Sequence, residues 1–169
     1  MNSLKKILII GSGQAAIYAA SEFRKYDKDS TVTIFGNENY HPYERPPLSK
    51  EFLMNKKKED EFLFFSKNFF DDQNVSFINK TIDSVDFKNK FLISFDNNKY
   101  FYDKLLITTG STNRKIEIDN EIDNQIYYLR NLDEANKIKK TLIDAAVARY
   151  NQASPTKKVR VLNEGGRYI

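Results

Sequence analysis

The sequence predicts an α/β fold in which a parallel β-sheet is joined by a small three-stranded antiparallel meander. The apolar run 7–10 is typical of a buried parallel strand, and it breaks at once into Gly11 and Gly13 and then into small, helix-favouring residues. A second strand rich in β-branched residues follows at 31–35. Short alternating segments separated by turn-forming clusters follow between 81 and 101 and predict the meander.

The glycines form a G-x-G-x-x-A pattern between the first strand and the first helix, which is expected over 14–26. Gly11 permits a tight turn, and Gly13 lets backbone N–H groups approach a pyrophosphate. Ala16, in the third position, keeps the helix close to the strand. The pattern predicts a nucleotide-binding turn, although by itself it also occurs by accident in many chains.

The second strand, expected to pair with the first through a right-handed crossover, is followed by Asn37 and Glu38. These residues lie roughly twenty positions beyond the glycines, where an acidic group meets a ribose in dinucleotide-binding folds. Glu38 is the carboxylate at the strand end, while the Asn37 amide can both donate and accept hydrogen bonds. A simple surface turn is the alternative.

Composition excludes several classes of function. The 169 residues, with 13 Phe and 10 Tyr, suffice for one domain with a sizeable core. The absence of cysteine excludes disulfides, redox-active Cys pairs and thiolate-bound metals, and we expect no metal site. His41 is the single histidine, and no G-x-S-x-G elbow exists, which disfavours a Ser-His-Asp triad.

Charge and hydropathy favour a cytoplasmic protein that binds neither membranes nor nucleic acids. The net charge is +4, but the lysines at 56–58 are neutralised by the acids at 59–61. An unbalanced basic face with stacking aromatics, which nucleic-acid binding requires, is not found. No apolar stretch is long enough to span a bilayer, and the N-terminus lacks the apolar region of a signal peptide.

The segment 39–50 contains three prolines and predicts a rigid loop, after which Ser49 is expected to cap a helix over 50–54. Such a loop presents Arg45 and Lys50 at fixed positions. Arg45 can bind phosphate through its forked guanidinium, and Lys50 offers a compact charge to the electron-rich end of a cofactor. The alternative is a rigid surface loop with two ordinary cations.

The sequence pattern is less regular in the elements that follow. We expect a charged connection over 51–61, a short strand or packing segment over 62–65, a Ser66-capped helix over 67–72 and a strand over 75–78. The meander strands are expected at 81–86, 91–94 and 99–101.

The parallel sheet is expected to regain a strand at 105–107, followed by a turn over 108–111 at the strand end, where ligands bind. Later in the chain, Asn131 and Glu134 have the spacing of a capping box. The apolar stripe of the helix that they begin consists of Ala135, Ile138, Leu142 and Ala145.

Segments 9–15 and 42–50 together resemble the start of the ferredoxin-reductase-type flavoproteins. These are the NAD(P)H-dependent ferredoxin, rubredoxin and putidaredoxin reductases, which are related to apoptosis-inducing factor within the pyridine nucleotide-disulfide oxidoreductase superfamily. The run Y-E-R-P-P-L-S-K carries the resemblance most specifically. The resemblance implies a Rossmann-like FAD-binding fold, incomplete relative to the family.

The resemblance also implies roles for individual residues. The FAD pyrophosphate would be held at Gly11, Gly13, Gln14 and Ala15. The adenosine ribose would meet Asn37 or Glu38, with Glu38 the substitute because the family usually has an acid where Asn37 stands.

Further FAD contacts come from the rest of the chain. Arg45 would meet an FAD phosphate or sugar, and Lys50, the catalytic candidate, would lie near the flavin N5. The backbone near Ile82 would meet the adenine. The L-L-I-T-T-G run matches the second FAD motif of the family through Thr109 and Gly110, and Arg130 occupies another FAD-contacting position.

By this resemblance, residues 1–150 are the N-terminal part of an FAD-binding domain, 151–157 a linker, and 158–169 the truncated start of an NAD(P)H-binding domain. Asn163 and Glu164 stand there in place of two glycines.

The implied activity is electron transfer from NAD(P)H through FAD to a ferredoxin- or rubredoxin-type acceptor. We expect no turnover from this chain by itself, because the NAD(P)H site is absent; a partner chain would have to supply the missing domains. The alternatives are a non-catalytic FAD-binding or adenine-nucleotide-binding module and a truncated, inactive remnant.

Overall fold

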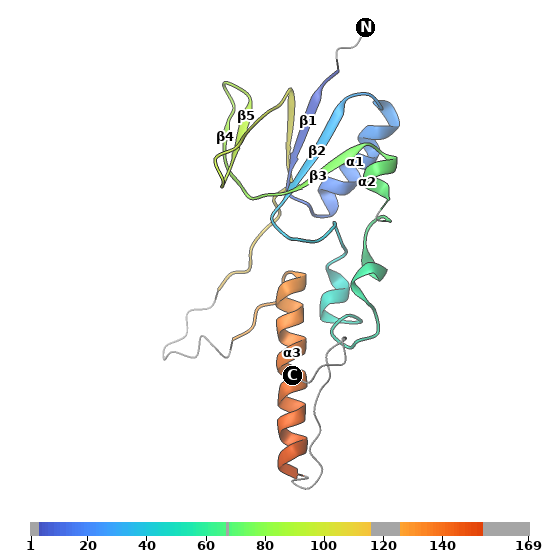
Figure 1. Ribbon diagram of the computed structural model, residues 1–169, viewed down its shortest axis with the longest axis vertical. Coiled ribbons are helices and arrows are strands. Elements are labelled where there is room, and N and C mark those ends of the chain that lie inside the picture. The colour runs from blue at the N-terminus through green and yellow to red at the C-terminus, as the bar shows by residue number, and fades with distance from the viewer. Residues whose placement is uncertain (1–3, 67, 116–125, 154–169) are drawn as a thin grey trace. The chain divides into compact units, whose positions relative to one another are not determined.

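The computed structural model describes residues 4–66, 68–115 and 126–153 (Figure 1). The chain divides into two compact units. The first unit consists of the residues up to Glu44 together with Lys58–Thr112, and the second of Arg45–Lys57 together with the residues from Asn113 onward.

The first unit is built on a parallel sheet, as the sequence predicted, and this sheet has four strands. In the order β3-β2-β1-β7, its strands are Val75–Asn79, Thr31–Gly36, Lys6–Ile10 and Lys104–Ile107. Ile10 lies opposite Phe35 on one side and Ile107 on the other. The carboxyl ends of these three strands therefore meet at one edge of the sheet.

Successive residues of the central strands alternate between two apolar cores. One face carries Ile9, Val32 and Ile34, which pack with Ala16 and Ala20 of helix α1 (Gln14–Tyr26). Both alanines are completely buried, so the helix axis lies close to the sheet. The opposite face carries Leu8, Ile10 and Phe35, which pack with Leu92 and Tyr102. Because both faces are covered, β1 is apolar throughout its last four residues.

The antiparallel meander is also confirmed. It consists of β4 (Ile82–Asp86), β5 (Phe91–Ser94) and β6 (Lys99–Phe101), paired in that order. Lys90 and Asn97 adopt left-handed backbone conformations in its two turns, with φ of 56° and 63°.

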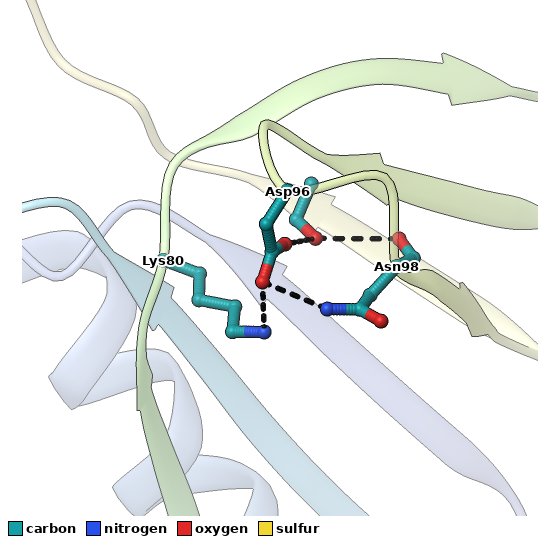
Figure 2. Close-up of polar contacts among 4 residues, drawn as sticks. Lys80, Asp96 and Asn98 are labelled. Carbon is teal, nitrogen blue, oxygen red and sulfur yellow. Dashed lines mark hydrogen bonds and ion pairs between the residues drawn. The ribbon is translucent and has the colours of Figure 1, made fainter.

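The second turn of the meander is closed by hydrogen bonds to Asp96 (Figure 2). One carboxylate oxygen accepts a hydrogen bond from the Ser94 hydroxyl, and the other accepts from Lys80 Nζ at 2.5 Å and from Asn98 Nδ2 at 2.7 Å. The Lys80 hydrogen bond, followed by that of Ser94, lowers the pKa of Asp96 from 3.8 to about 2.

The prediction of a Ser49-capped helix over 50–54 was wrong. The structure has no helix over 50–54: a 3-10 helix, η1 (Pro46–Ser49), takes its place one turn earlier, and turns follow it. The two prolines occupy the first helical positions, where their fixed φ suits a short helix, and Lys50 leaves helical geometry with φ −127° and ψ −106°. Ser49 therefore ends a helix and does not begin one.

The region 59–72 also differs from the expectation. A 3-10 helix, η2 (Glu59–Phe62), lies within the expected charged connection, and an isolated antiparallel bridge joins Leu63 to Tyr43. The packing alternative for 62–65 is therefore the correct one. Helix α2 (Phe69–Asp72) begins later than expected, while position 67 lies outside the described residues.

The second unit contains η1 and helix α3 (Leu132–Ala153). As predicted, the Asn131 side chain caps α3 by accepting a hydrogen bond from the Glu134 amide at 2.8 Å. The apolar stripe is buried only where the helix begins: Ala135 is inaccessible, whereas Leu142 is 55% exposed.

Helix α3 continues through the first three positions of the expected linker, and the rest of that linker and residues 158–169 lie outside the described residues. Among the helices that the structure describes, none is both long enough and apolar enough to cross a membrane.

The first stability prediction concerns Arg24, a buried cation at the end of α1 that is 3% exposed. Its guanidinium donates to the carbonyls of Ser30 at 2.6 Å and Asn74 at 2.7 Å, so it joins α1 to the starts of β2 and β3. Arg24→Met should lower the free energy of unfolding by about 3 kcal/mol, because it removes charge-assisted hydrogen bonds and leaves the carbonyl of the buried Ser30 without this donor. Urea denaturation measures this loss.

The matched control is Lys25→Met, because the neighbouring Lys25 side chain is 64% exposed and pairs with Glu22 on the surface. It should change stability by no more than about 0.5 kcal/mol. Equal losses in the two variants would contradict the role given to Arg24.

The second prediction concerns pH. Because the pKa of Asp96 lies below its ordinary value in the folded state, Asp96 stabilises the fold above pH 3.8, and this contribution disappears as the pH falls towards about 2. The stability difference between the parent protein and Asp96→Asn should therefore narrow across that interval. Urea denaturation at several pH values measures it, and Lys80→Gln should weaken the same pH dependence. A difference that stays constant with pH would contradict the assignment.

Candidate nucleotide-binding site

The glycine turn, residues 11–13, lies where β1, β2 and β7 end together. Gly11 has a φ of +102°, and its amide donates to the Phe35 carbonyl at 2.8 Å. A Cβ atom at Gly11 would lie 2.2 Å from the carbonyl oxygen of Thr108. Thr108 is itself held by its amide and its hydroxyl, which donate to the Ile10 carbonyl at 2.7 Å and 2.9 Å. Only glycine fits at position 11.

Gly13 differs from Gly11 because the space around it is open. It is the N-cap of α1 with φ −84° and ψ −169°, and a Cβ atom there would meet no atom of the described residues within 4 Å. Gln14 and Ala15 are exposed in the first turn, which contains no acidic residue, and Ala16 behind them is buried. The first amides of α1 therefore face an accessible space, which suits an anion.

Gly36, at the end of β2, is a residue that the sequence analysis missed. A Cβ atom there would lie 2.4 Å from the Ser12 hydroxyl oxygen and 3.0 Å from the Phe77 ring. The absence of a side chain at position 36 therefore lets the end of β2 approach the glycine turn closely. The available signal was a glycine at the end of an apolar strand, directly before the candidate ribose-binding residues.

The structure distinguishes Asn37 from Glu38. Asn37 is exposed, whereas Glu38 is partly buried and its Oε2 accepts a hydrogen bond from the Tyr43 hydroxyl. Both residues follow β2 at the edge where the glycine turn lies. The carboxylate is thus held at this edge by a tyrosine that the sequence analysis did not assign to the site.

Three further candidates belong to the first unit. Thr109 and Gly110 are exposed and directly follow Thr108, and Gly110 has a φ of +71°. Ile82 begins β4 and packs against the core that contains Ile10 and Phe35, near the ends of β1 and β2. The first unit therefore combines nine of the twelve candidates: Gly11, Gly13, Gln14, Ala15, Asn37, Glu38, Ile82, Thr109 and Gly110.

The other three candidates, Arg45, Lys50 and Arg130, belong to the second unit. Arg45 Nη1 donates to the Arg130 carbonyl at 2.5 Å, and the Arg130 amide donates to Glu134 Oε2 at 2.5 Å. These bonds bring the two arginines together. Lys50 is exposed just after η1, and its amide donates to the Pro47 carbonyl at 3.0 Å.

The described residues include no group of three or more His, Cys, Asp or Glu side chains that could hold a metal ion. At the sheet edge, backbone amides can donate hydrogen bonds to a phosphate group, and the Glu38 carboxylate can accept hydrogen bonds from hydroxyl groups.

Comparison with known proteins agrees with the resemblance seen in the sequence. The chain is 30% identical over 141 residues to the rubredoxin-NAD(+) reductase of Pseudomonas putida, covering 83% of this chain and 37% of that protein. It is 32% identical over 136 residues to the ferredoxin--NAD(+) reductase component of the 3-phenylpropionate/cinnamic acid dioxygenase of Photorhabdus laumondii, covering 80% and 34%. The chain thus spans about a third of the length of these relatives.

Solved structures show the same likeness. The ferredoxin reductase for the CYP199A2 system from Rhodopseudomonas palustris matches 82% of this chain and 34% of its own, with a TM-score of 0.77 and 29% identity. The NADH:rubredoxin oxidoreductase from Clostridium acetobutylicum matches 82% and 35%, with a TM-score of 0.71 and 31% identity.

The model of the family described as pyridine nucleotide-disulphide oxidoreductase matches residues 5–161. This range contains β1, the glycine turn, β2, the meander and α3. Since the match extends over most of the sequence, the chain belongs to the pyridine nucleotide-disulphide oxidoreductase family.

Proposed function

We propose that this chain is the FAD-binding N-terminal portion of an NAD(P)H-dependent oxidoreductase that passes electrons through FAD to a ferredoxin- or rubredoxin-type acceptor. The observation that carries the proposal is the glycine turn, in which Gly11 is required by contact with Thr108 while Gly13 borders open space. Family membership and the names of the relatives support the reaction class.

The residues of the turn fit the pyrophosphate of FAD. A bound pyrophosphate would accept hydrogen bonds from the first amides of α1, around Gly13, Gln14 and Ala15, while Gly11 keeps the strand close to Thr108. The positive end of the α1 dipole favours the same negative charge.

The adenosine half of FAD is assigned to the ends of β2 and β4. In this proposal Glu38, rather than the exposed Asn37, accepts hydrogen bonds from the ribose hydroxyls. The backbone near Ile82 lies against the adenine, and Thr109 and Gly110 approach the cofactor from the end of β7.

The cations of the second unit keep the roles that the family resemblance implies for them. We assign Arg45 to an FAD phosphate or sugar, Arg130 to a further FAD contact and Lys50 to the neighbourhood of the flavin N5. FAD, when bound, supplies the capacity to accept a hydride and to pass on electrons. The protein supplies orientation: Glu134 holds the Arg130 backbone, whose carbonyl holds the Arg45 guanidinium.

The proposed organisation assigns residues 1–150 to the FAD-binding domain and 151–157, apart from the helical residues that end α3, to a connection. Residues 158–169 are assigned to the start of an NAD(P)H-binding domain. We further propose that the protein acts in the cytoplasm, where its acceptor is a small iron–sulfur or rubredoxin-type protein.

The first test uses Gly13→Val. Because a Cβ atom at position 13 would meet no described atom within 4 Å, this variant should stay folded and lose no more than about 1 kcal/mol of stability, the cost of a poorer N-cap residue. FAD binding should weaken at least about tenfold as the side chain occupies the pyrophosphate space. Flavin fluorescence titration measures binding, and thermal denaturation measures stability.

Gly11→Ala is the structural counterpart of this variant. It should lose stability as well as FAD binding, because its Cβ would collide with the Thr108 carbonyl. FAD binding by Gly13→Val with unchanged affinity would overturn the pyrophosphate assignment. Binding of ADP but not FAD by the parent chain would point to an adenine-nucleotide module.

The second test uses Arg45→Ala, which removes a guanidinium from the proposed cofactor contacts. We expect FAD affinity to fall about tenfold. Lys56→Ala is the matched control, because Lys56 is an exposed cation of the same unit and should leave the affinity unchanged. Equal FAD affinities for Arg45→Ala and Lys56→Ala would refute the Arg45 assignment.

A further inference from the structure

Tyr43 belongs to the segment 39–50, the proline-rich motif, whose sequence also contains Arg45 and Lys50, yet the proposed function gives it no role. Its side chain is buried, with 5% of its surface exposed, and its hydroxyl donates to Glu38 Oε2. A phenol keeps its proton at neutral pH, so the hydroxyl can act as a donor to the carboxylate without a change in charge.

The ring of Tyr43 is held in place by aromatic contacts and by the backbone around it. It packs edge-to-face against Phe62, which is 2% exposed, at a centroid distance of 6.0 Å, and against Tyr40 at 6.2 Å. The Glu44 amide donates to the Phe62 carbonyl at 2.8 Å, and an antiparallel bridge pairs Tyr43 with Leu63. The hydroxyl is therefore a fixed donor.

Glu38, in contrast, lies two residues beyond the end of β2, at the edge of the sheet that contains the glycine turn. A glutamate there has three rotatable side-chain bonds, and ordering them when a ligand binds costs affinity. A hydrogen bond from a fixed hydroxyl selects one orientation before the ligand arrives. Such preorganisation benefits a ligand whose own hydroxyl groups meet the carboxylate.

We propose that Tyr43 is a positioning residue for nucleotide recognition, whose hydroxyl orients the Glu38 carboxylate to accept hydrogen bonds from the ribose hydroxyls of the adenosine moiety. The inference rests on the proposed FAD-binding function and adds a residue that acts through Glu38. It assigns the aromatic part of the proline-rich motif to the ribose, whereas the cations of the same motif are assigned elsewhere on the cofactor.

The test compares the full chain with Tyr43→Phe, which keeps the ring and removes the hydroxyl. The probes are FAD, ADP and 2′,3′-dideoxy-ADP, which lacks both ribose hydroxyls, with affinities measured by calorimetry. Tyr43→Phe should lower the affinities for ADP and FAD about fivefold and leave the affinity for dideoxy-ADP unchanged. General damage to the fold would instead lower the affinities for all three ligands together. The ratio of the ADP affinity to the dideoxy-ADP affinity therefore separates a positioning role from a structural one.

Two further variants complete the experiment. On a Glu38→Ala background, Tyr43→Phe should have no additional effect on the ADP affinity, because the group that the hydroxyl orients is absent. Tyr26→Phe removes a hydroxyl from an 83% exposed tyrosine that ends α1 and should change nothing.

The outcomes distinguish the two proposals. If the folded parent binds FAD and ADP but Tyr43→Phe leaves the affinities unchanged, or weakens ADP and dideoxy-ADP equally, the positioning role is overturned and the proposed function stands. If the folded parent binds neither FAD nor ADP, the proposed function fails, and the inference fails with it. Thermal denaturation of each variant establishes that the compared proteins are folded.

Discussion

The close approach of Gly11 to the Thr108 carbonyl is the contact on which the first unit depends. A Cβ atom would lie 2.2 Å from that oxygen, so β1 and the segment after β7 can meet only because position 11 has no side chain. The Gly11 amide also donates to Phe35 at the end of β2. One residue thus aligns three strand ends and sets where α1 begins, so that the first amides of the helix face the edge of the sheet where ligands bind.

The three glycines around this edge serve different physical purposes. Gly11 and Gly36 avoid collisions within the protein, with Thr108 and with Ser12 respectively. Gly13 avoids no described atom, so its missing side chain matters to whatever enters the space in front of α1. Open space in front of a helix N-terminus is what an anion site requires.

Hydrogen bonds hold the side chains of two charged candidates, Glu38 in the first unit and Arg45 in the second. In the first unit a buried tyrosine holds the Glu38 carboxylate. In the second unit the Asn131 side chain caps α3 at Glu134, Glu134 accepts from the Arg130 amide, and the Arg130 carbonyl accepts from Arg45. Hydrogen bonds at the start of α3 thereby hold Arg45, which is 85 residues from Arg130 in the sequence. Groups ordered in advance lose less conformational entropy when they bind a ligand.

Local patterns in the sequence predicted the parallel sheet, the meander, the glycine turn and the Asn131 cap, because each depends on neighbouring residues or on a fixed period of apolar side chains. The prediction of a helix over 50–54 was wrong because Pro46 and Pro47 begin a 3-10 helix earlier in the chain. The need for glycine at position 36 and the Tyr43–Glu38 hydrogen bond were decided by the tertiary structure. Both result from loops and strand ends that fold against one another, and such approaches leave no periodic signal in the chain.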